Sequence, residues 1–252
     1  MPLQNRVDPL NNIVANDSRG MLMGNRGCLH DDQKQIAGKR WTTHSWVTCA
    51  LSFNGRKREL MAPRNYTELF FLDEATALAA GHRPCWECRR NNYTAFISAS
   101  KQAHKLPMDE KLTVKEIDKV MHRDRTTAIA DRAPILGNDL PDAAMVIDGE
   151  KRIWVRWQGA FYQWSFEGYG TVQDQFDGPV KLVTPNSTMR VLRHGYRAGM
   201  HPTLCPPVLG PTPEPAKPVR SAIIRKIQCL RWQLLTAPVT HQSRLPPLSA
   251  DL

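Results

Sequence analysis

The chain has 252 residues, 41% of them hydrophobic, which is enough to fill one large core or two small ones. It contains no run of about 18 apolar residues, so the sequence predicts no membrane-spanning helix. The formal net charge is +10 at pH 7, which favours a polyanionic partner, although residues 211–252 alone hold six Lys and Arg against two acidic residues.

The cysteines are six in number and irregularly spaced, and they favour a reducing compartment over a disulfide framework. The first residues, MPLQNRVDPLNN, lack the apolar segment of a signal peptide. We therefore expect a cytoplasmic protein. Its cysteines are Cys28, Cys49, Cys85, Cys88, Cys205 and Cys229.

A first module is expected over residues 15–104. The segments WVTCALSF (46–53) and RKRELMA (56–62) flank Asn54-Gly55, a dipeptide that accepts the positive φ angles of a two-residue hairpin turn. The sequence therefore predicts a β-hairpin with Cys49 on its first strand.

A strand and two helices should follow this hairpin. YTELFFL (66–72) is typical of a strand, and Asp73 is a suitable N-cap for a short helix that Gly81 ends as the C′ residue. In residues 89–105, Tyr93, Phe96 and Ile97 recur at helical spacing, so a second helix is predicted there.

The second module is expected over residues 105–200. Residues 112–134 have apolar positions at helical spacing, and β-rich runs then follow at 143–157, 159–166 and 179–184. Asn186, Ser187 and Thr188 provide caps for a short helix that ends at Gly195. The predicted class is α+β: a zinc-knuckle module, a β-meander module with a capping helix, and a Pro-rich basic tail over residues 201–252 with little compact structure.

The pair Cys85-x-x-Cys88 predicts a metal site. Two thiolates two residues apart can bind one Zn²⁺, and a pair that follows a helix, a Gly and an Arg-Pro is unlike a thioredoxin-type redox motif. Cys49 is the first choice for a third ligand, the alternative being an apolar core cysteine. For the fourth ligand we favour His30, with Cys28 nearly equal.

The segment FFLDEATALAAGHRPCWECRR resembles the second half of the zinc-binding, methylphosphotriester-repair domain of Ada-type DNA repair proteins. A strand, an E-A-x-A-x-x-A-G helix, an R-P and a C-x-x-C occur there in the same order. The resemblance covers about residues 70–90 and implies that Cys85 and Cys88 bind zinc. In that family one thiolate of an earlier C-x-x-x-C pair accepts the methyl group, but Cys49 has no cysteine at this spacing, so the resemblance implies zinc binding rather than methyl transfer.

A group of basic residues surrounds the predicted zinc site. If zinc ties the hairpin to the C-x-x-C turn, these side chains share one surface that can contact phosphates in a sequence-independent way. The alternative is an ordinary solvated basic face. The residues are Arg56, Lys57, Arg58, Arg83, Arg89 and Arg90.

The sequence thus predicts a zinc-dependent nucleic-acid-binding protein, with DNA as the preferred partner, in repair, regulation or modification. The alternatives are an enzyme acting on nucleic acid, either a nuclease or a group-transfer repair protein, and a structural zinc module for protein interaction. His30-Asp31-Asp32 and His122-Arg123-Asp124 are weak catalytic candidates, since neither has a partner motif elsewhere in the chain.

Overall fold

The computed structural model describes residues 1–36, 38–57, 59–103 and 113–204. Residues Met1–Leu204 form one compact unit, and its described residues contain two six-stranded sheets and four α-helices. The predicted α+β class is confirmed. Most of the predicted Pro-rich tail lies outside the described residues.

The first sheet has the strand order β2-β1-β5-β3-β4-β6. Most neighbouring strands are antiparallel, but β1 runs parallel to β5 and β4 runs parallel to β6. It begins upstream of residue 15, where the sequence placed the start of the first module. Its strands are β1 (Gln4–Val7), β2 (Ile13–Ala15), β3 (Leu22–Asn25), β4 (Val47–Ala50), β5 (Leu69–Phe71) and β6 (Arg83–Pro84).

The predicted hairpin is half right. Asn54 and Gly55 have φ angles of 50° and 65°, and the Arg56 N–H donates to the Phe53 carbonyl at 3.1 Å, so the expected tight turn is present. In the described part of residues 56–62, however, no strand follows the turn. Both edges of β4 are taken by other strands: β3 pairs with one edge, with Met23 opposite Cys49, and β6 pairs with the other.

The short helix α1 (Glu74–Ala79) has the predicted caps. The Asp73 carboxylate accepts a hydrogen bond from the Thr76 N–H at 2.9 Å, and Gly81 follows the helix with φ +82°. All six residues of α1 are buried, which is why the helix is rich in alanine. Helix α2 (Arg90–Ala103) follows the cysteine pair and buries Phe96, as predicted.

Two buried carboxylates fix the start of α1 to later parts of the chain. Asp73 accepts hydrogen bonds from the Tyr169 hydroxyl at 2.8 Å and the His201 N–H at 3.0 Å. Glu74 accepts from the Gly199 N–H at 2.8 Å and pairs with Arg89 at 2.8 Å. These bonds join α1 to strand β11 (Gly168–Gln173) and to the segment that follows helix α4 (Asn186–Arg193).

The second sheet has the order β11-β10-β9-β8-β12-β7, with the expected antiparallel meander from β8 to β11. Its strands are β7 (Pro134–Ile135), β8 (Met145–Ile147), β9 (Ile153–Trp157), β10 (Ala160–Ser165), β11 (Gly168–Gln173) and β12 (Val180–Leu182).

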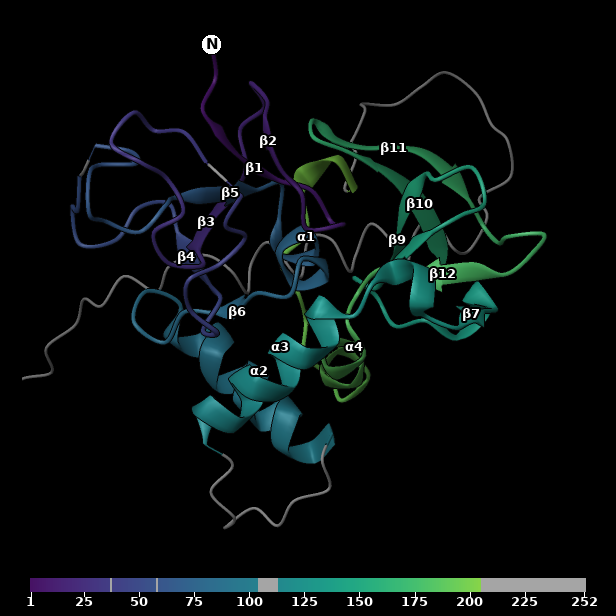
Figure 1. Cartoon of the computed structure of the whole chain (residues 1–252). Helices are drawn as coiled ribbons and strands as arrows, with labels where there is room; N and C mark the ends of the chain where they lie inside the picture. The colour runs from purple at the N-terminus through teal and green to yellow at the C-terminus, as the bar shows by residue number, and fades with distance from the viewer. Residues whose placement is uncertain (37, 58, 104–112, 205–252) are drawn as a thin grey trace, which may run out of the picture. The chain divides into compact units, whose positions relative to one another are not determined.

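Helices α3 (Val114–Thr126) and α4 (Asn186–Arg193) lie beside α2, below the two sheets in Figure 1. The predicted cap of α4 is wrong: the helix begins after Pro185, which makes no side-chain capping bond. Asp124 of α3 replaces it and accepts the Ser187 N–H at 2.8 Å.

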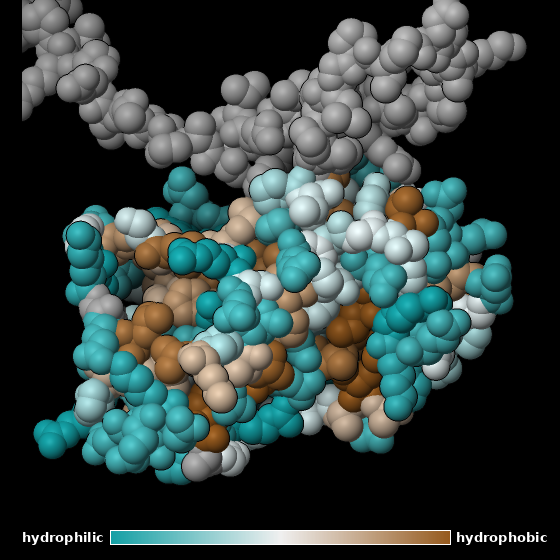
Figure 2. Space-filling view, turned by 90° about the horizontal axis from the view of Figure 1, so that it is seen from above, coloured by the Kyte–Doolittle hydropathy of each residue, from teal (hydrophilic) through white to brown (hydrophobic). Residues whose placement is uncertain are grey.

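One hydrophobic core runs across the boundary expected near residue 104. It joins Leu78 of α1 and Phe96 of α2 to Met121 of α3 and to the meander strands. Seen from above, exposed hydrophobic residues form separate patches bordered by hydrophilic ones (Figure 2). In the described part of the chain, every helix is too short or too polar to cross a bilayer.

Candidate metal centre

The pairing of β4 with β6 brings three cysteines together. The two strands run parallel, with Thr48 next to Pro84, and the Cys85 N–H donates to the Thr48 carbonyl at 2.8 Å. Cys49, within β4, and Cys85, directly after β6, therefore lie side by side. The turn after Cys85 then returns Cys88 to the same place, where its sulfur accepts the Ala50 N–H at 3.4 Å.

The sulfur atoms of Cys49, Cys85 and Cys88 all lie within 4.8 Å of one another. Zn–S bonds of about 2.3 Å in a tetrahedron place sulfur atoms roughly 3.8 Å apart, so the three thiols fit one zinc ion after a small adjustment. Three sulfur ligands also favour zinc over magnesium or calcium, which prefer oxygen ligands.

The three thiols differ in acidity. The pKa of Cys85 falls to about 5, because the Cys49 side chain is hydrogen-bonded to it and the backbone N–H groups of Cys88 and Glu87 add to the effect. The same bond to Cys85, together with burial, raises the pKa of Cys49, and burial raises that of Cys88. Cys85 is therefore the thiolate that is ready for a metal at neutral pH, since the thiolate is the ligating form.

His30 and Cys28, the two candidates for a fourth ligand, do not join this cluster. The buried His30 ring lies near the Thr67 hydroxyl, 2.7 Å from Nδ1, and the Ala62 carbonyl, 3.2 Å from Nε2. The Cys28 sulfur lies 3.7 Å from the His30 carbonyl. The reason is the strand register: Cys49 pairs with Met23, and β3 runs from there toward Cys28, away from the centre.

A cavity of about 410 Å³ adjoins the cysteine cluster, and all three cysteines line it. Its wall also contains Tyr66 and Glu68. Glu68 is buried, and its Oε2 accepts the Met61 N–H at 2.8 Å. In the described part of the chain, no other His, Cys, Asp or Glu lies close enough to join the three cysteines, so the fourth side of the centre is left without a ligand from these residues.

The cavity wall was not predicted, although the sequence contains a signal for it. Tyr66, Glu68 and Phe70 all line the cavity, and they alternate along the chain at the period of an extended strand. Which side of the strand faces the cysteines depends on the order of strands in the sheet, and this order is not visible in the residues themselves.

Two of the predicted phosphate-binding arginines are held inside the protein. Arg83 is 5% exposed and binds both carboxylate oxygens of Asp118, at 2.7 Å and 2.8 Å. Arg89 pairs with the buried Glu74 and donates to the Thr48 hydroxyl at 2.8 Å. Both side chains tie the cysteine turn to the core and are not part of an exposed basic face.

Three of the remaining predicted basic residues, Arg56, Lys57 and Arg90, are exposed. Arg56 pairs with Glu87, with Nη1 at 3.3 Å from Oε2, and both Arg56 and Lys57 line the cavity rim. Arg90 lies over the ring of Trp86, with 3.9 Å from its guanidinium carbon to the ring centre, and Trp86 is 55% exposed. Arg58 lies outside the described residues.

Comparison of the chain with protein-family models, with curated proteins and with solved structures finds no significant match.

Proposed function

We propose that the protein binds zinc through Cys49, Cys85 and Cys88, and that the exposed cations around this centre bind nucleic acid, with DNA as the first candidate. The observation that carries the proposal is the convergence of three sulfur atoms from β4 and the turn after β6, within 4.8 Å of one another. Two separate segments of the chain meet there at a spacing that suits a tetrahedral metal.

The proposed interface consists of Arg56, Lys57 and Arg90, all exposed. Arginine and lysine at the surface neutralise phosphates, which supplies most of the affinity in sequence-independent binding. Trp86, stacked under Arg90 and more than half exposed, adds a flat ring on which a base can stack. The resemblance of residues 70–90 to the Ada-type repair domain points in the same direction.

A group-transfer enzyme is the second candidate, and the cavity favours it over a purely structural zinc module. Structural zinc sites are closed by four protein ligands, whereas catalytic sites keep one position open. Here the three cysteines line an open cavity of about 410 Å³ together with the buried carboxyl of Glu68.

Metal analysis with zinc-edge X-ray spectroscopy tests the metal half. We expect one zinc per chain with three sulfur neighbours, lost in Cys49→Ser and Cys85→Ser and kept in Cys28→Ser and His30→Ala. A protein purified without chelator that contains no zinc, or one whose zinc is lost in Cys28→Ser alone, would overturn this assignment.

Titration of the zinc-loaded protein with duplex and single-stranded DNA tests the nucleic-acid half. Binding should weaken steeply with salt. A protein of matched net charge is the control, and equal binding by both would refute the proposed interface. Turnover, or covalent modification of Cys49 by an alkylated DNA, would instead favour the enzyme.

A further inference from the structure

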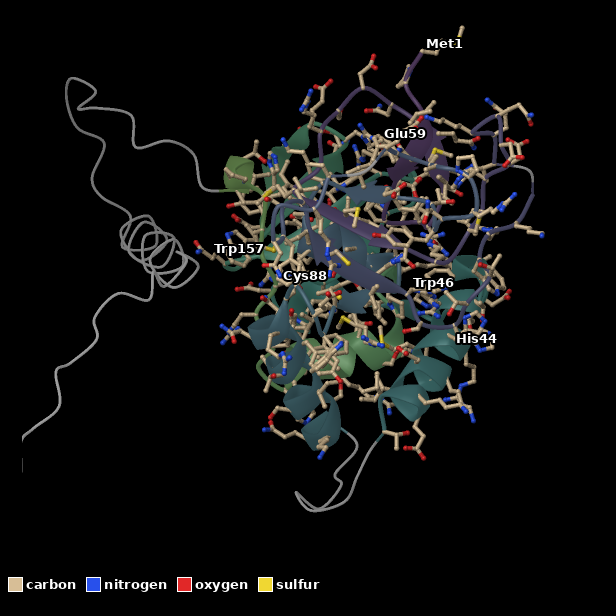
Figure 3. The ribbon with its side chains drawn as sticks, turned by 90° about the vertical axis from the view of Figure 1, so that its left-hand side faces the viewer. Met1, His44, Trp46, Glu59, Cys88 and Trp157 are labelled. Carbon is tan, nitrogen blue, oxygen red and sulfur yellow. The ribbon has the colours of Figure 1, made fainter. Side chains whose placement is uncertain are left out.

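A second cavity, of about 300 Å³, lies on another part of the compact unit. Its wall is formed by the β1–β2 turn, the loop before β4, the end of α1 and the end of α3. Figure 3 shows His44 and Trp46, which lie in the loop before β4, close together and to one side of Cys88, and the two cavities share no lining residue. The cavity is therefore separate from the cysteine centre.

The charged groups that line this cavity are all cations. Arg40, Arg125 and Arg132 line it, and the lining residues include no carboxylate. Arg132 donates to the Leu182 carbonyl at 2.9 Å, whereas Arg40 is exposed and has its Nη2 at 3.2 Å from the Asn11 carbonyl. A cavity with three guanidinium groups and no acidic neighbour in its wall favours an anion.

Arg125 lines the cavity and is buried, with 7% of its surface exposed. Its Nη1 donates to the Gly81 carbonyl at 2.9 Å and its Nη2 to the His44 carbonyl at 2.6 Å. Its Nε, in contrast, is buried and has no hydrogen-bond partner among the described residues. A desolvated guanidinium with an unused N–H leaves its positive charge poorly compensated, which favours an anion in the adjoining cavity.

A second buried arginine, Arg26, shares the Trp46 ring with Arg125. Arg26 is fully buried, and its guanidinium carbon lies 4.2 Å from the centre of the Trp46 ring, on which Arg125 also lies at 3.9 Å. Burial first, and then the nearby charges of Arg125 and Arg40, hold the pKa of Arg26 well below its usual value. Its Nη1 and Nη2 have no hydrogen-bond partner among the described residues.

The carboxylates whose charges act on these two buried arginines already have partners. Asp8, the acid whose charge acts on Arg26, accepts two hydrogen bonds from Asn12 at 2.8 Å. Asp118, which acts on Arg125, binds Arg83 through both oxygens. The two guanidinium groups of Arg26 and Arg125 on the Trp46 ring therefore have no free carboxylate among these acids to neutralise them, and both groups are buried.

We propose that this cavity binds the phosphate group of a mononucleotide-sized ligand, with Arg40 contacting the phosphate oxygens, the charge of the buried Arg125 attracting them, and Trp41 stacking on the base. Trp41 lines the cavity, is 36% exposed, and lies 5.9 Å from the Trp46 ring centre. The volume is at the small end of ligand sites and suits one nucleotide rather than a duplex. The site does not depend on the zinc centre.

Fluorescence and calorimetric titrations of the full, zinc-loaded chain test this site, since Trp41 and Trp46 report on it directly. The probes are inorganic phosphate, adenosine 5′-monophosphate, adenosine, and a trinucleotide with or without a 5′-phosphate. We expect saturable binding of phosphate and of the monophosphate, and none of adenosine. Binding of the monophosphate identifies a free nucleotide as the ligand; binding of phosphate and of the 5′-phosphorylated trinucleotide without the monophosphate identifies a strand end.

Three variants sharpen the test. Arg40→Gln, at an exposed position, should weaken phosphate binding about tenfold or more, the cost of one charged hydrogen bond. Trp41→Leu should weaken binding of the monophosphate and leave inorganic phosphate unchanged. Arg123→Gln removes the same charge from an exposed position on α3 that does not line the cavity, and should change nothing. No saturable binding of any phosphate at millimolar concentration, equal binding of adenosine and its monophosphate, or an equal loss in Arg123→Gln would overturn the proposal.

Discussion

Arg83 and Asp118 form a buried, two-bonded ion pair between the strand that precedes the cysteine turn and helix α3, with N–O distances of 2.7 Å and 2.8 Å. Arg83 also donates to the Ser45 hydroxyl at 3.0 Å. The pair therefore connects β6, the loop before β4 and α3 at a single point. The two segments that supply the metal ligands are aligned by this contact as well as by backbone pairing.

Removal of either partner should be strongly destabilising. Arg83→Met or Asp118→Leu leaves an unpaired charge in the interior, which costs about 3–5 kcal/mol. The double variant should recover part of this loss, because it leaves neither charge uncompensated. Urea unfolding of both single variants and of the double variant measures the effect. A loss below about 0.5 kcal/mol, as for an ordinary surface change, would contradict it.

Gly81→Ala tests the close packing at the end of α1. Gly81 has φ +82°, and an added Cβ would lie 2.6 Å from Cδ of Arg125. The matched control is Gly55→Ala, at φ +65°, where an added Cβ meets nothing within 4 Å. Both variants suffer the left-handed penalty of about 1–2 kcal/mol, but only Gly81→Ala should lose more. Equal losses of unfolding free energy in the two variants, measured by thermal or urea unfolding, would show that the Arg125 side chain moves aside without destabilising the protein.

The buried His82 predicts a loss of stability in mild acid. Burial, and then the charges of Arg26 and Arg125, hold the pKa of His82 well below its usual value, so the folded protein keeps this ring neutral. Below about pH 6.5 the unfolded chain binds a proton there and the folded chain does not. The contribution of this group to the free energy of unfolding should therefore be complete above pH 6.5. It should be lost as the pH is lowered, by up to about 1.4 kcal/mol per pH unit.

Urea unfolding at several values between pH 7.5 and pH 5 measures this slope. His82→Phe removes the titrating ring while keeping an aromatic side chain beside Phe71 and Trp46, and it should lower the slope by about one proton. An unchanged slope in the variant would assign the pH dependence to other groups.

Glu87 competes with a phosphate for Arg56, because the two side chains form an exposed ion pair. If the proposed interface binds DNA, Glu87→Gln should strengthen binding roughly two- to fivefold, the range expected from releasing one surface pair. Arg56→Gln should weaken binding and lower the salt slope by about 0.9 for the lost phosphate contact.

Arg190→Gln, at an exposed position on α4, is the control for charge alone. DNA binding by each variant is measured at three salt concentrations, which gives both its affinity and its salt slope. An equal effect of Arg190→Gln and Arg56→Gln would place the DNA elsewhere on the protein.

Local signals in the sequence predicted the elements that depend on neighbouring residues. Asp73, Gly81 and the Asn54-Gly55 turn each act within a few positions, so the cap, the C′ residue and the turn were confirmed. The convergence of Cys49 with Cys85 and Cys88 was also predicted, since a zinc site needs ligands beyond the C-x-x-C pair and Cys49 was the first choice among them.

What the sequence did not predict depends on which strands become neighbours. β4 pairs with β3 and not with residues 56–62. Because β3 runs away from the cysteine centre, the chain after it carries His30 away from the centre as well, to a place beside Thr67. The burial of Arg83 follows from its contact with Asp118, 35 residues later. Both facts depend on tertiary contacts that no short window of residues contains.

The bonds from Asp73 and Glu74 to Tyr169, Gly199 and His201 set an order for events during synthesis. A ribosome that has translated the three cysteines still has about a hundred residues to add before these two carboxylates receive their donors from Tyr169, Gly199 and His201. Until then Asp73 has only Thr76, and Glu74 only Arg89, as partners from the earlier part of the chain. The nascent chain can bring its three thiols together early, but the bonds that fix the start of α1 are complete only after residue 201 has been synthesised.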